Sequence, residues 1–366
     1  MKKCWFEVLL LSIIAFLSAL LVWWPFAARI TGSMLTVFAN YDGPNYIVIA
    51  KTLYDKAQIA DTFSLPIPLE YYPAHLPGYP LLIKIFAAFL PGTWAMLTST
   101  VLPAILATII FYLLLKKFRL TAHPFWLSLL FLFLPARWLA VRSVGSPEPL
   151  FIFAILASFY FFKSNKFFLA GIFGAVAQIT KTPGILLFIA YCLLLLGKYT
   201  KTKKFEWRAW PLLLIPFSLF LVFLFYQKQT GDFWAYFYSG DNFHLVFPPY
   251  QSFISGRSWL GQIWIEDMIW QYLIGALAVI HLIKQRHYDL ASFAGIFFAA
   301  TLFIAHRDLA RYSLPLMPFA LIAFEKFLTN RAFKIAFFII LPAIYLYALN
   351  FIAGNTAPIA DWTPYL

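Results

Sequence analysis

One carboxylate, Asp42, stands between a long apolar segment and an amphipathic one in the stretch FANYDGPNYIVIAKTLYD. Gly43 and Pro44 favour a turn there, and apolar residues then recur at helical spacing from Tyr46 to Leu53. Such a helix is expected to lie on a bilayer surface. A carboxylate held there could act as a general base toward an acceptor hydroxyl. The alternative is that Asp42 only caps the helix, because Asp is common at helix starts.

Further ionisable residues stand at the ends of apolar segments, where inserting a charge costs roughly 2.5–3.5 kcal/mol and usually implies a partner or a task. Cations that converge there would suit a phosphate and favour its departure from a glycosyl centre. The alternatives are snorkelling to the interface and pairing of Arg311 with Asp308 or Glu148. The residues are Arg142 and Glu148 in VRSVGSPEPLF, Lys181 in QITKTPGILL, and His306, Arg307, Asp308 and Arg311 in AHRDLARYSLPLMPF.

Metal and nucleotide motifs are absent from the sequence. His75, in EYYPAHLPGYP, has no partner at metal-ligand spacing, and the chain has neither an HxxxH pair nor a DxD pair. Two cysteines exclude a disulfide framework and a Cys-based metal site. Walker A, GxGxxG and GxSxG patterns are missing as well. We therefore expect no metal and no cofactor.

The composition identifies the setting in which these residues act. Of 366 residues, 62% are apolar and only 12% are charged, and the mean hydropathy is +0.78. Such a composition excludes a water-soluble globular fold. The sequence predicts an all-α polytopic membrane protein. The net charge of +13 is interpreted as a topology signal and not as a nucleic-acid-binding surface.

Segments of about 20 apolar residues are long enough to cross a bilayer as helices. The segment 76–91 is short for a crossing, has Lys84 in its middle and lies between Pro77 and Pro91, so we expect an interfacial helix there. The predicted spans are 6–28, 94–115, 124–141, 147–162, 166–180, 183–197, 209–227, 262–283, 289–305, 311–327 and 332–350.

The distribution of basic residues orients these 11 spans, because cytoplasmic loops collect Lys and Arg. With the N-terminus inside and 76–91 not crossing, the cytoplasmic side holds 17 of the 28 basic residues and only four acids. The C-terminus is then outside. Residues 1–350 form a single membrane domain, with long outer loops at about 30–93 and 228–261 and a short outer tail at 351–366. The clustered acids lie in the outer loops, so we expect the chemistry on that face.

Five segments resemble, in the same order, elements of the PIG-V-like mannosyltransferases, which belong to the GT-C class of membrane glycosyltransferases. They are YDGPNYIVIAK, YYPAHLPGYPLLIK, GSPEPLFIF, TKTPGILL and RYSLPLMPF. The resemblance covers about residues 35–320, and the order of the segments carries more weight than any one of them. It implies a GT-C-like bundle with interfacial helices in the first outer loop.

The resemblance also implies a function and a set of roles. It implies an inverting glycosyltransferase that moves one sugar, mannose by analogy, from a polyprenyl- or dolichyl-phosphate donor to a hydroxyl of a glycolipid or surface acceptor. Asp42 matches the base, Glu148 the acid of the Ser-Glu element and Arg311 the Arg of the Arg-Tyr element. Lys181 replaces an Arg, and Tyr41 replaces a Trp before Asp42, which leaves the sugar open. Arg142, His306, Arg307, His75 and Tyr72 complete the candidate substrate-binding residues.

A different class of function remains open, namely a transporter or flippase for a lipid-linked glycan. It predicts polar groups at mid-span and broken helices at the bilayer midplane, whereas the mid-span positions here are mostly apolar. A membrane assembly subunit without activity is a third alternative. The expected partners are the lipid-phosphate sugar, a glycan acceptor and membrane lipids, with no nucleic acid. The expected location is a plasma membrane with an extracytoplasmic active face, or the endoplasmic reticulum membrane in a eukaryote.

Overall fold

The computed structural model describes residues 2–240, 244–254, 262–306 and 308–366. It is 76% helical, and its described residues contain no β-strand. Among them, six apolar helices are long enough to cross a membrane: Cys4–Ala27, Gly92–Lys117, Thr182–Thr202, Trp207–Thr230, Glu266–Lys284 and Arg331–Gly354. The chain is therefore an all-α, multi-pass membrane protein, as the composition predicts.

The remaining predicted spans coincide with shorter or interrupted helices. Residues 147–162, 166–180 and 289–305 correspond to α9 (Glu148–Lys163), α10 (Phe167–Thr180) and α15 (Tyr288–Thr301). Residues 124–141 are divided between α7 (Pro124–Phe133) and α8 (Ala136–Val141). Residues 311–327 are divided among α16 (Leu309–Tyr312), η5 (Leu314–Leu316), α17 (Met317–Ala323) and α18 (Glu325–Leu328). The count of 11 crossings stays a prediction.

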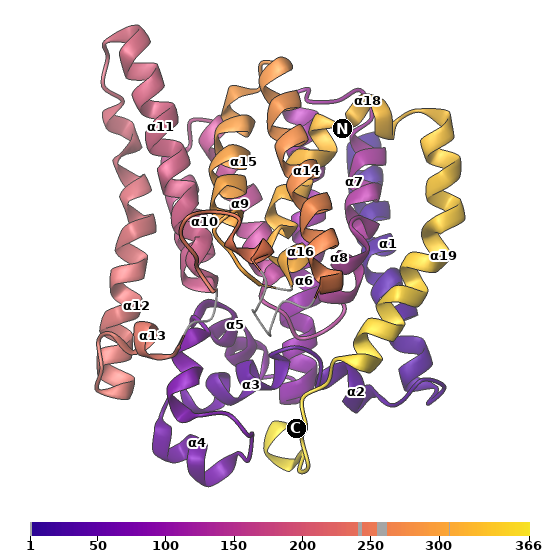
Figure 1. Ribbon diagram of the computed structural model, residues 1–366, viewed down its shortest axis with the longest axis vertical. Coiled ribbons are helices and arrows are strands. Elements are labelled where there is room, and N and C mark those ends of the chain that lie inside the picture. The colour runs from indigo at the N-terminus through magenta and orange to yellow at the C-terminus, as the bar shows by residue number, and fades with distance from the viewer. Residues whose placement is uncertain (1, 241–243, 255–261, 307) are drawn as a thin grey trace.

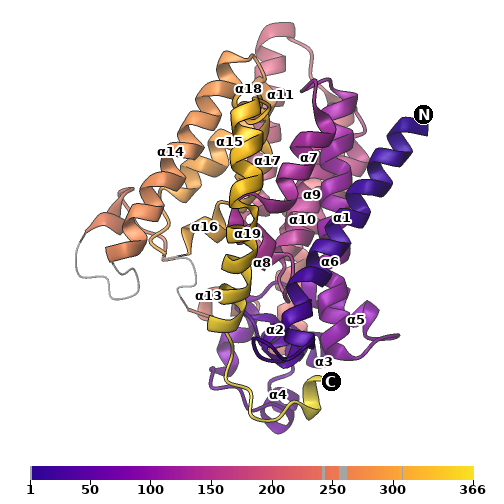
Figure 2. The ribbon, with the colours of Figure 1, turned by 90° about the vertical axis from the view of Figure 1, so that its right-hand side faces the viewer.

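The two chain termini and different sets of connections lie at opposite ends of the molecule (Figures 1 and 2). One end holds the N-terminus with α1 (Lys2–Ala27), α18 and the connections that leave α11 (Ile185–Thr202) and α14 (Gln262–Lys284). The other end holds the C-terminus, α2 (Met34–Phe38), α4 (Lys56–Thr62) and α13 (Ala235–Tyr238). The basic connections thus gather at the end opposite the first long loop.

The first long loop folds into a compact layer of short elements. These are α2, α3 (Gly43–Thr52), α4, η1 (Leu69–Ala74) and α5 (Gly78–Phe86). Helix α5 has nine residues. With a rise of about 1.5 Å per residue it extends about 13 Å, which is too short to cross a hydrocarbon core of about 30 Å. A Cβ at Gly78 would lie 2.6 Å from Thr180 Oγ1, so glycine allows α5 to start directly against the end of α10.

Helix α3 differs from the expected surface helix. Eight of its ten residues are buried, and its Lys51 donates hydrogen bonds to the carbonyl oxygens of Pro364 (2.6 Å) and Leu366 (3.0 Å). Lys51 itself stays exposed, and the buried residues of α3 pack mainly against α5 and α6 (Gly92–Lys117). Asn40, three residues before α3, donates hydrogen bonds to the carbonyl oxygens of Ile352 (2.8 Å) and Asn355 (2.7 Å), which ties the start of α3 to the end of α19 (Arg331–Gly354).

Candidate functional site

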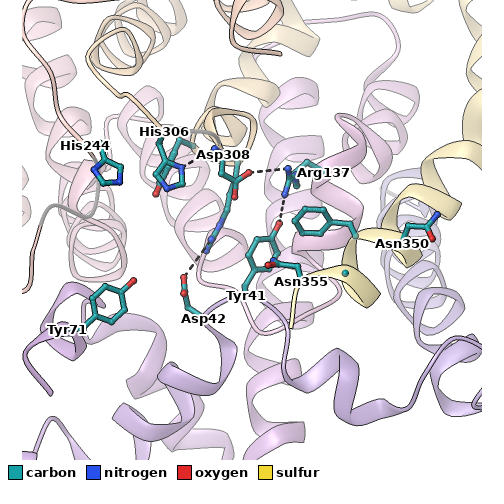
Figure 3. Close-up of a pocket in the computed structure, with 13 residues that line it drawn as sticks. Tyr41, Asp42, Tyr71, Arg137, His244, His306, Asp308, Asn350 and Asn355 are labelled. Carbon is teal, nitrogen blue, oxygen red and sulfur yellow. Dashed lines mark hydrogen bonds and ion pairs between the residues drawn. The ribbon is translucent and has the colours of Figure 1, made fainter. Parts of the chain in front are cut away.

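Asp42 occupies the N-cap position of α3, but its side chain makes no capping hydrogen bond. Its carboxylate faces the interior of the molecule instead, where Oδ2 lies 3.7 Å from Arg311 Nη1 and 3.8 Å from His75 Nε2. Both contacts are longer than a hydrogen bond, and the side chain keeps 35% of its surface exposed. Asp42 is thus an accessible carboxylate on the wall of a cavity (Figure 3).

Glu148, at the start of α9, brings together two of the cations that the sequence singles out. Its Oε1 accepts hydrogen bonds from Lys181 Nζ at 2.6 Å and from Arg311 Nε at 2.7 Å, and its Oε2 lies 3.4 Å from Arg311 Nη2. The Ser146 hydroxyl also donates to Glu148. The residue is 1% exposed. It therefore holds Lys181 and Arg311 in place from the buried side of the site.

A second ion pair lies beside this group and was not predicted. Arg137 Nη2 lies 3.2 Å from Asp308 Oδ1, and Arg137 Nη1 donates to the Tyr41 hydroxyl at 3.2 Å. The Tyr41 ring in turn lies 4.4 Å from the guanidinium of Arg311. Arg137 belongs to α8, directly after the interruption at Pro135. The sequence signal for it was an arginine inside a predicted span, two residues after a proline.

The three carboxylates and three basic side chains border two cavities of opposite character. The larger is a polar chamber of about 700 Å³, lined by Tyr41, Asp42, Tyr71, Arg137, His244, His306, Asp308, Arg311, Tyr312, Asn350, Phe351, Gly354 and Asn355 (Figure 3). The smaller is an apolar pocket of about 190 Å³, lined mainly by Phe151, Pro183, Ile185, Leu186, Leu245, Phe297, Ala300, Ile304 and Pro315. Arg311 and Tyr312 line both cavities, and Glu148 and Lys181 line the apolar pocket.

The other predicted site residues differ in whether they line the polar chamber. His306 lines the chamber, and its Nδ1 accepts a hydrogen bond from the backbone of Asp308 at 3.0 Å. His75 is buried behind Asp42. Tyr72 is buried in the hydrophobic core, and its neighbour Tyr71 lines the chamber in its place. Arg307 lies outside the described residues.

Arg142 does not join the site. Its guanidinium donates hydrogen bonds to the carbonyl oxygens of Leu132 (3.0 Å) and Ala15 (3.1 Å) and to the Ser18 hydroxyl (2.7 Å), and the residue is 1% exposed. It therefore connects α8 to α1 and to the end of α7. The prediction that Arg142 binds substrate came from its position at a span end, which does not show the direction of the side chain.

We expect Arg142→Met to lower the stability of the protein without changing the affinity for a substrate. Each carbonyl left unsatisfied in the interior costs about 1–3 kcal/mol. Thermal unfolding of the purified variant and its KM, measured on the folded fraction, separate the two effects. A raised KM with unchanged stability would show that Arg142 contributes to substrate binding.

The charges around Asp42 set its ionisation. Burial in the cavity raises the pKa of the carboxyl, but the neighbouring His75 and the positive charge of Arg311 outweigh burial and lower the pKa to about 2. An opposite charge near a carboxyl favours its ionised form, so Asp42 is ionised at neutral pH. A base with so low a pKa is weak in the resting protein, and neutralisation of Arg311 by an anion would strengthen it.

This pKa predicts how pH affects stability. The ordinary value is 3.8, so the ionised Asp42 stabilises the folded state above about pH 4, and this contribution disappears as the pH falls toward about 2. The difference in unfolding free energy between wild type and Asp42→Asn should be constant from about pH 8 to 5 and should shrink below about pH 4. Chemical unfolding across this range measures it. A difference that stays the same from pH 5 down to 2 would contradict the lowered pKa of Asp42.

Neither a metal cluster nor a known relative identifies the site. The described residues contain no group of three or more His, Cys, Asp and Glu side chains placed to hold a metal ion. Comparison of the sequence with protein-family models and with curated proteins gives no match. The functional assignment therefore depends on the geometry of the chamber, on its charged residues and on the resemblance of the five sequence segments.

Proposed function

We propose that the protein is an inverting glycosyltransferase that moves one sugar, mannose by resemblance, from a polyprenyl- or dolichyl-phosphate donor to an acceptor hydroxyl. The observation that carries the proposal is the polar chamber and the apolar pocket that share Arg311 and Tyr312. A lipid-phosphate sugar has parts that match these two cavities: an apolar chain, a charged phosphate and a polyhydroxylated sugar. The fold would be a GT-C-like bundle.

In the proposed reaction the donor phosphate binds at Arg311 and Lys181, with the part of the isoprenoid chain next to the phosphate in the apolar pocket and the sugar in the chamber. The acceptor oxygen attacks the anomeric carbon while Asp42 takes its proton. The bond from that carbon to the phosphate oxygen breaks, and the lipid phosphate leaves with the electron pair. Fixed cations beside the leaving oxygens stabilise the charge that develops there.

Glu148 acts in this mechanism as a positioning residue. Lys181 has three N–H donors and Arg311 has five, so their contacts to Glu148 leave donors for a phosphate. A phosphate at Arg311 would also offset the positive charge that lowers the pKa of Asp42. Donor binding would then make Asp42 a stronger base at the moment when a base is needed.

The remaining assignments follow from the topology. The chamber would open on the extracytoplasmic face of a plasma membrane with the N-terminus in the cytoplasm, or on the lumenal face of the endoplasmic reticulum in a eukaryote. The acceptor would be a glycolipid or a surface glycan. A monophosphate leaving group needs less charge compensation than a diphosphate, so we propose that the reaction proceeds without a metal.

The test is sugar transfer by purified protein in lipid vesicles that contain labelled polyprenyl-phosphate mannose and candidate glycolipid acceptors. Polyprenyl-phosphate glucose and a sugar nucleotide serve as matched donors, and EDTA tests for a metal. Transfer from the lipid-phosphate sugar, unaffected by EDTA, with an inverted anomeric centre in the product supports the proposal. Transfer from the sugar nucleotide alone contradicts it.

The flippase alternative has a separate readout. Interrupted helices, which that alternative predicts, occur between α7 and α8 and among α16, α17 and α18. The same vesicles, prepared with a fluorescent lipid-linked sugar, would show transbilayer movement as protection from a membrane-impermeant quencher. Transbilayer movement of the lipid, without sugar transfer from any donor, would show that the protein is a transporter and not a transferase.

A further inference from the structure

A second apolar cavity, of about 630 Å³, lies between α11 and η3 (Trp207–Leu213), which leads into α12 (Leu214–Thr230). Its lining includes Phe188, Leu195, Leu196, Trp207, Trp210 and Leu213, and Glu206 is the charged residue among the lining side chains. The connection from α11 to η3 lies at the end of the molecule that holds the N-terminus, whereas α3 lies toward the other end (Figure 1). The cavity is therefore separate from the candidate active site.

A basic segment, residues 198–208 with the sequence KYTKTKKFEWR, joins the two sides of this cavity. It carries five basic residues and one acid. The acid, Glu206, is paired with Lys198 at 2.7 Å. Lys203 ends α11 in a left-handed conformation with φ 54°, which turns the chain back toward η3. Lys201, Lys203 and Lys204 are exposed beside the cavity, and the segment offers no further carboxylate to neutralise them.

Exposed aromatic residues flank the same segment. Phe205 and Trp207 form a ring pair with centroids 4.4 Å apart, and Trp207 and Trp210 are 77% and 65% exposed. Large exposed aromatic rings next to lysines are typical of the level of lipid headgroups. From these rings the apolar lining continues along α11 from Tyr199 to Phe188, within a helix long enough to cross a membrane, and the lysines follow at the end of that helix.

We propose that this cavity binds one anionic glycerophospholipid, with an acyl chain between α11 and η3 and the phosphate held by Lys201, Lys203 and Lys204. Any lipid chain could enter an apolar cavity, but the uncompensated positive charge selects an anionic headgroup over a zwitterionic one. A protein partner is disfavoured because a cavity that continues into the hydrocarbon region is in contact with lipid chains. The site is independent of the proposed transferase activity.

The protein itself carries a reporter for this site. Cys192 is exposed and lines the cavity, and Cys4 is the only other cysteine. In a Cys4→Ser protein, a bimane label on Cys192 can be quenched by brominated lipids in phosphatidylcholine nanodiscs. We expect half-maximal quenching at about a tenfold lower mole fraction of brominated phosphatidylglycerol than of brominated phosphatidylcholine.

Two triple variants separate a specific site from general surface charge. Lys201→Gln/Lys203→Gln/Lys204→Gln should abolish the preference, whereas Lys326→Gln/Arg331→Gln/Lys334→Gln removes three charges near α18, at the same end of the molecule, and should preserve it. Because the label itself occupies space, thermal unfolding of unlabelled protein is the second measurement. Added phosphatidylglycerol should raise the Tm of wild type and of the second triple variant but not of the first.

The proposal is overturned by equal quenching from both lipids together with equal Tm shifts. It is also overturned if both triple variants lose the preference to the same extent, since the effect would then be a general surface potential.

Discussion

Asp42→Asn is expected to lower the rate of sugar transfer by about 10²- to 10⁴-fold, the range that general-base catalysis contributes. The amide has the shape of the carboxyl but cannot take the acceptor proton. Arg311 would remain in place because Glu148 Oε1 holds its Nε at 2.7 Å. Donor binding should therefore persist, and kcat should fall while KM for the donor changes little. Single-turnover transfer with labelled donor in vesicles measures the chemical step.

A matched control, Asp55, lies further along the same loop. It is the N-cap of α4, and its carboxylate accepts a hydrogen bond from the backbone N–H of Gln58 at 2.9 Å. Asn is as good an N-cap as Asp, so Asp55→Asn should leave both turnover and stability unchanged. Equal turnover of Asp42→Asn and wild type would remove Asp42 from the role of base. A parallel loss of folded protein in Asp42→Asn would assign it a structural role.

The comparison of these two aspartates shows what the sequence could predict. Both precede a helix, and propensity assigns both as caps. Only the fold decides that Asp55 bonds to its own helix while Asp42 turns toward Arg311, a residue from a distant part of the chain. The helical nature of the chain and the position of each apolar segment could be predicted, because hydrophobicity and periodicity are local properties.

The site residues that the sequence could predict from charge were those at the ends of apolar segments. Glu148, Lys181 and Arg311 stand out because charges at membrane depth require partners, and the structure brings all three together. Arg137 was not predicted because it lies inside a predicted span, which was read as one continuous helix although the chain is interrupted at Pro135 between α7 and α8. The prediction of a surface position for α3 was wrong because α3 packs against α5 and α6, which bury eight of its ten residues, and the amphipathic pattern of one segment does not show these partners.

Glu148→Gln is expected to be the most destabilising substitution at the site. The carboxylate is 1% exposed and compensates both Lys181 and Arg311, and removing one partner of a buried ion pair costs about 3–5 kcal/mol. The amide keeps the volume, so no cavity adds to this cost. Unfolding free energies of wild type and variant, measured by denaturant titration in the same detergent, test the expectation, and transfer activity should fall as well because the two cations lose their orientation.

A double variant distinguishes the loss of stability from the loss of function. In Glu148→Gln/Lys181→Met one of the two uncompensated cations is removed, so part of the lost stability should return. Turnover should not return, because the donor phosphate would then have lost Lys181. Recovery of both stability and turnover would show that Lys181 does not bind the donor and that Glu148 serves the fold alone. Recovery of neither would show that the ion pair between Glu148 and Arg311, and not the one with Lys181, carries the stability.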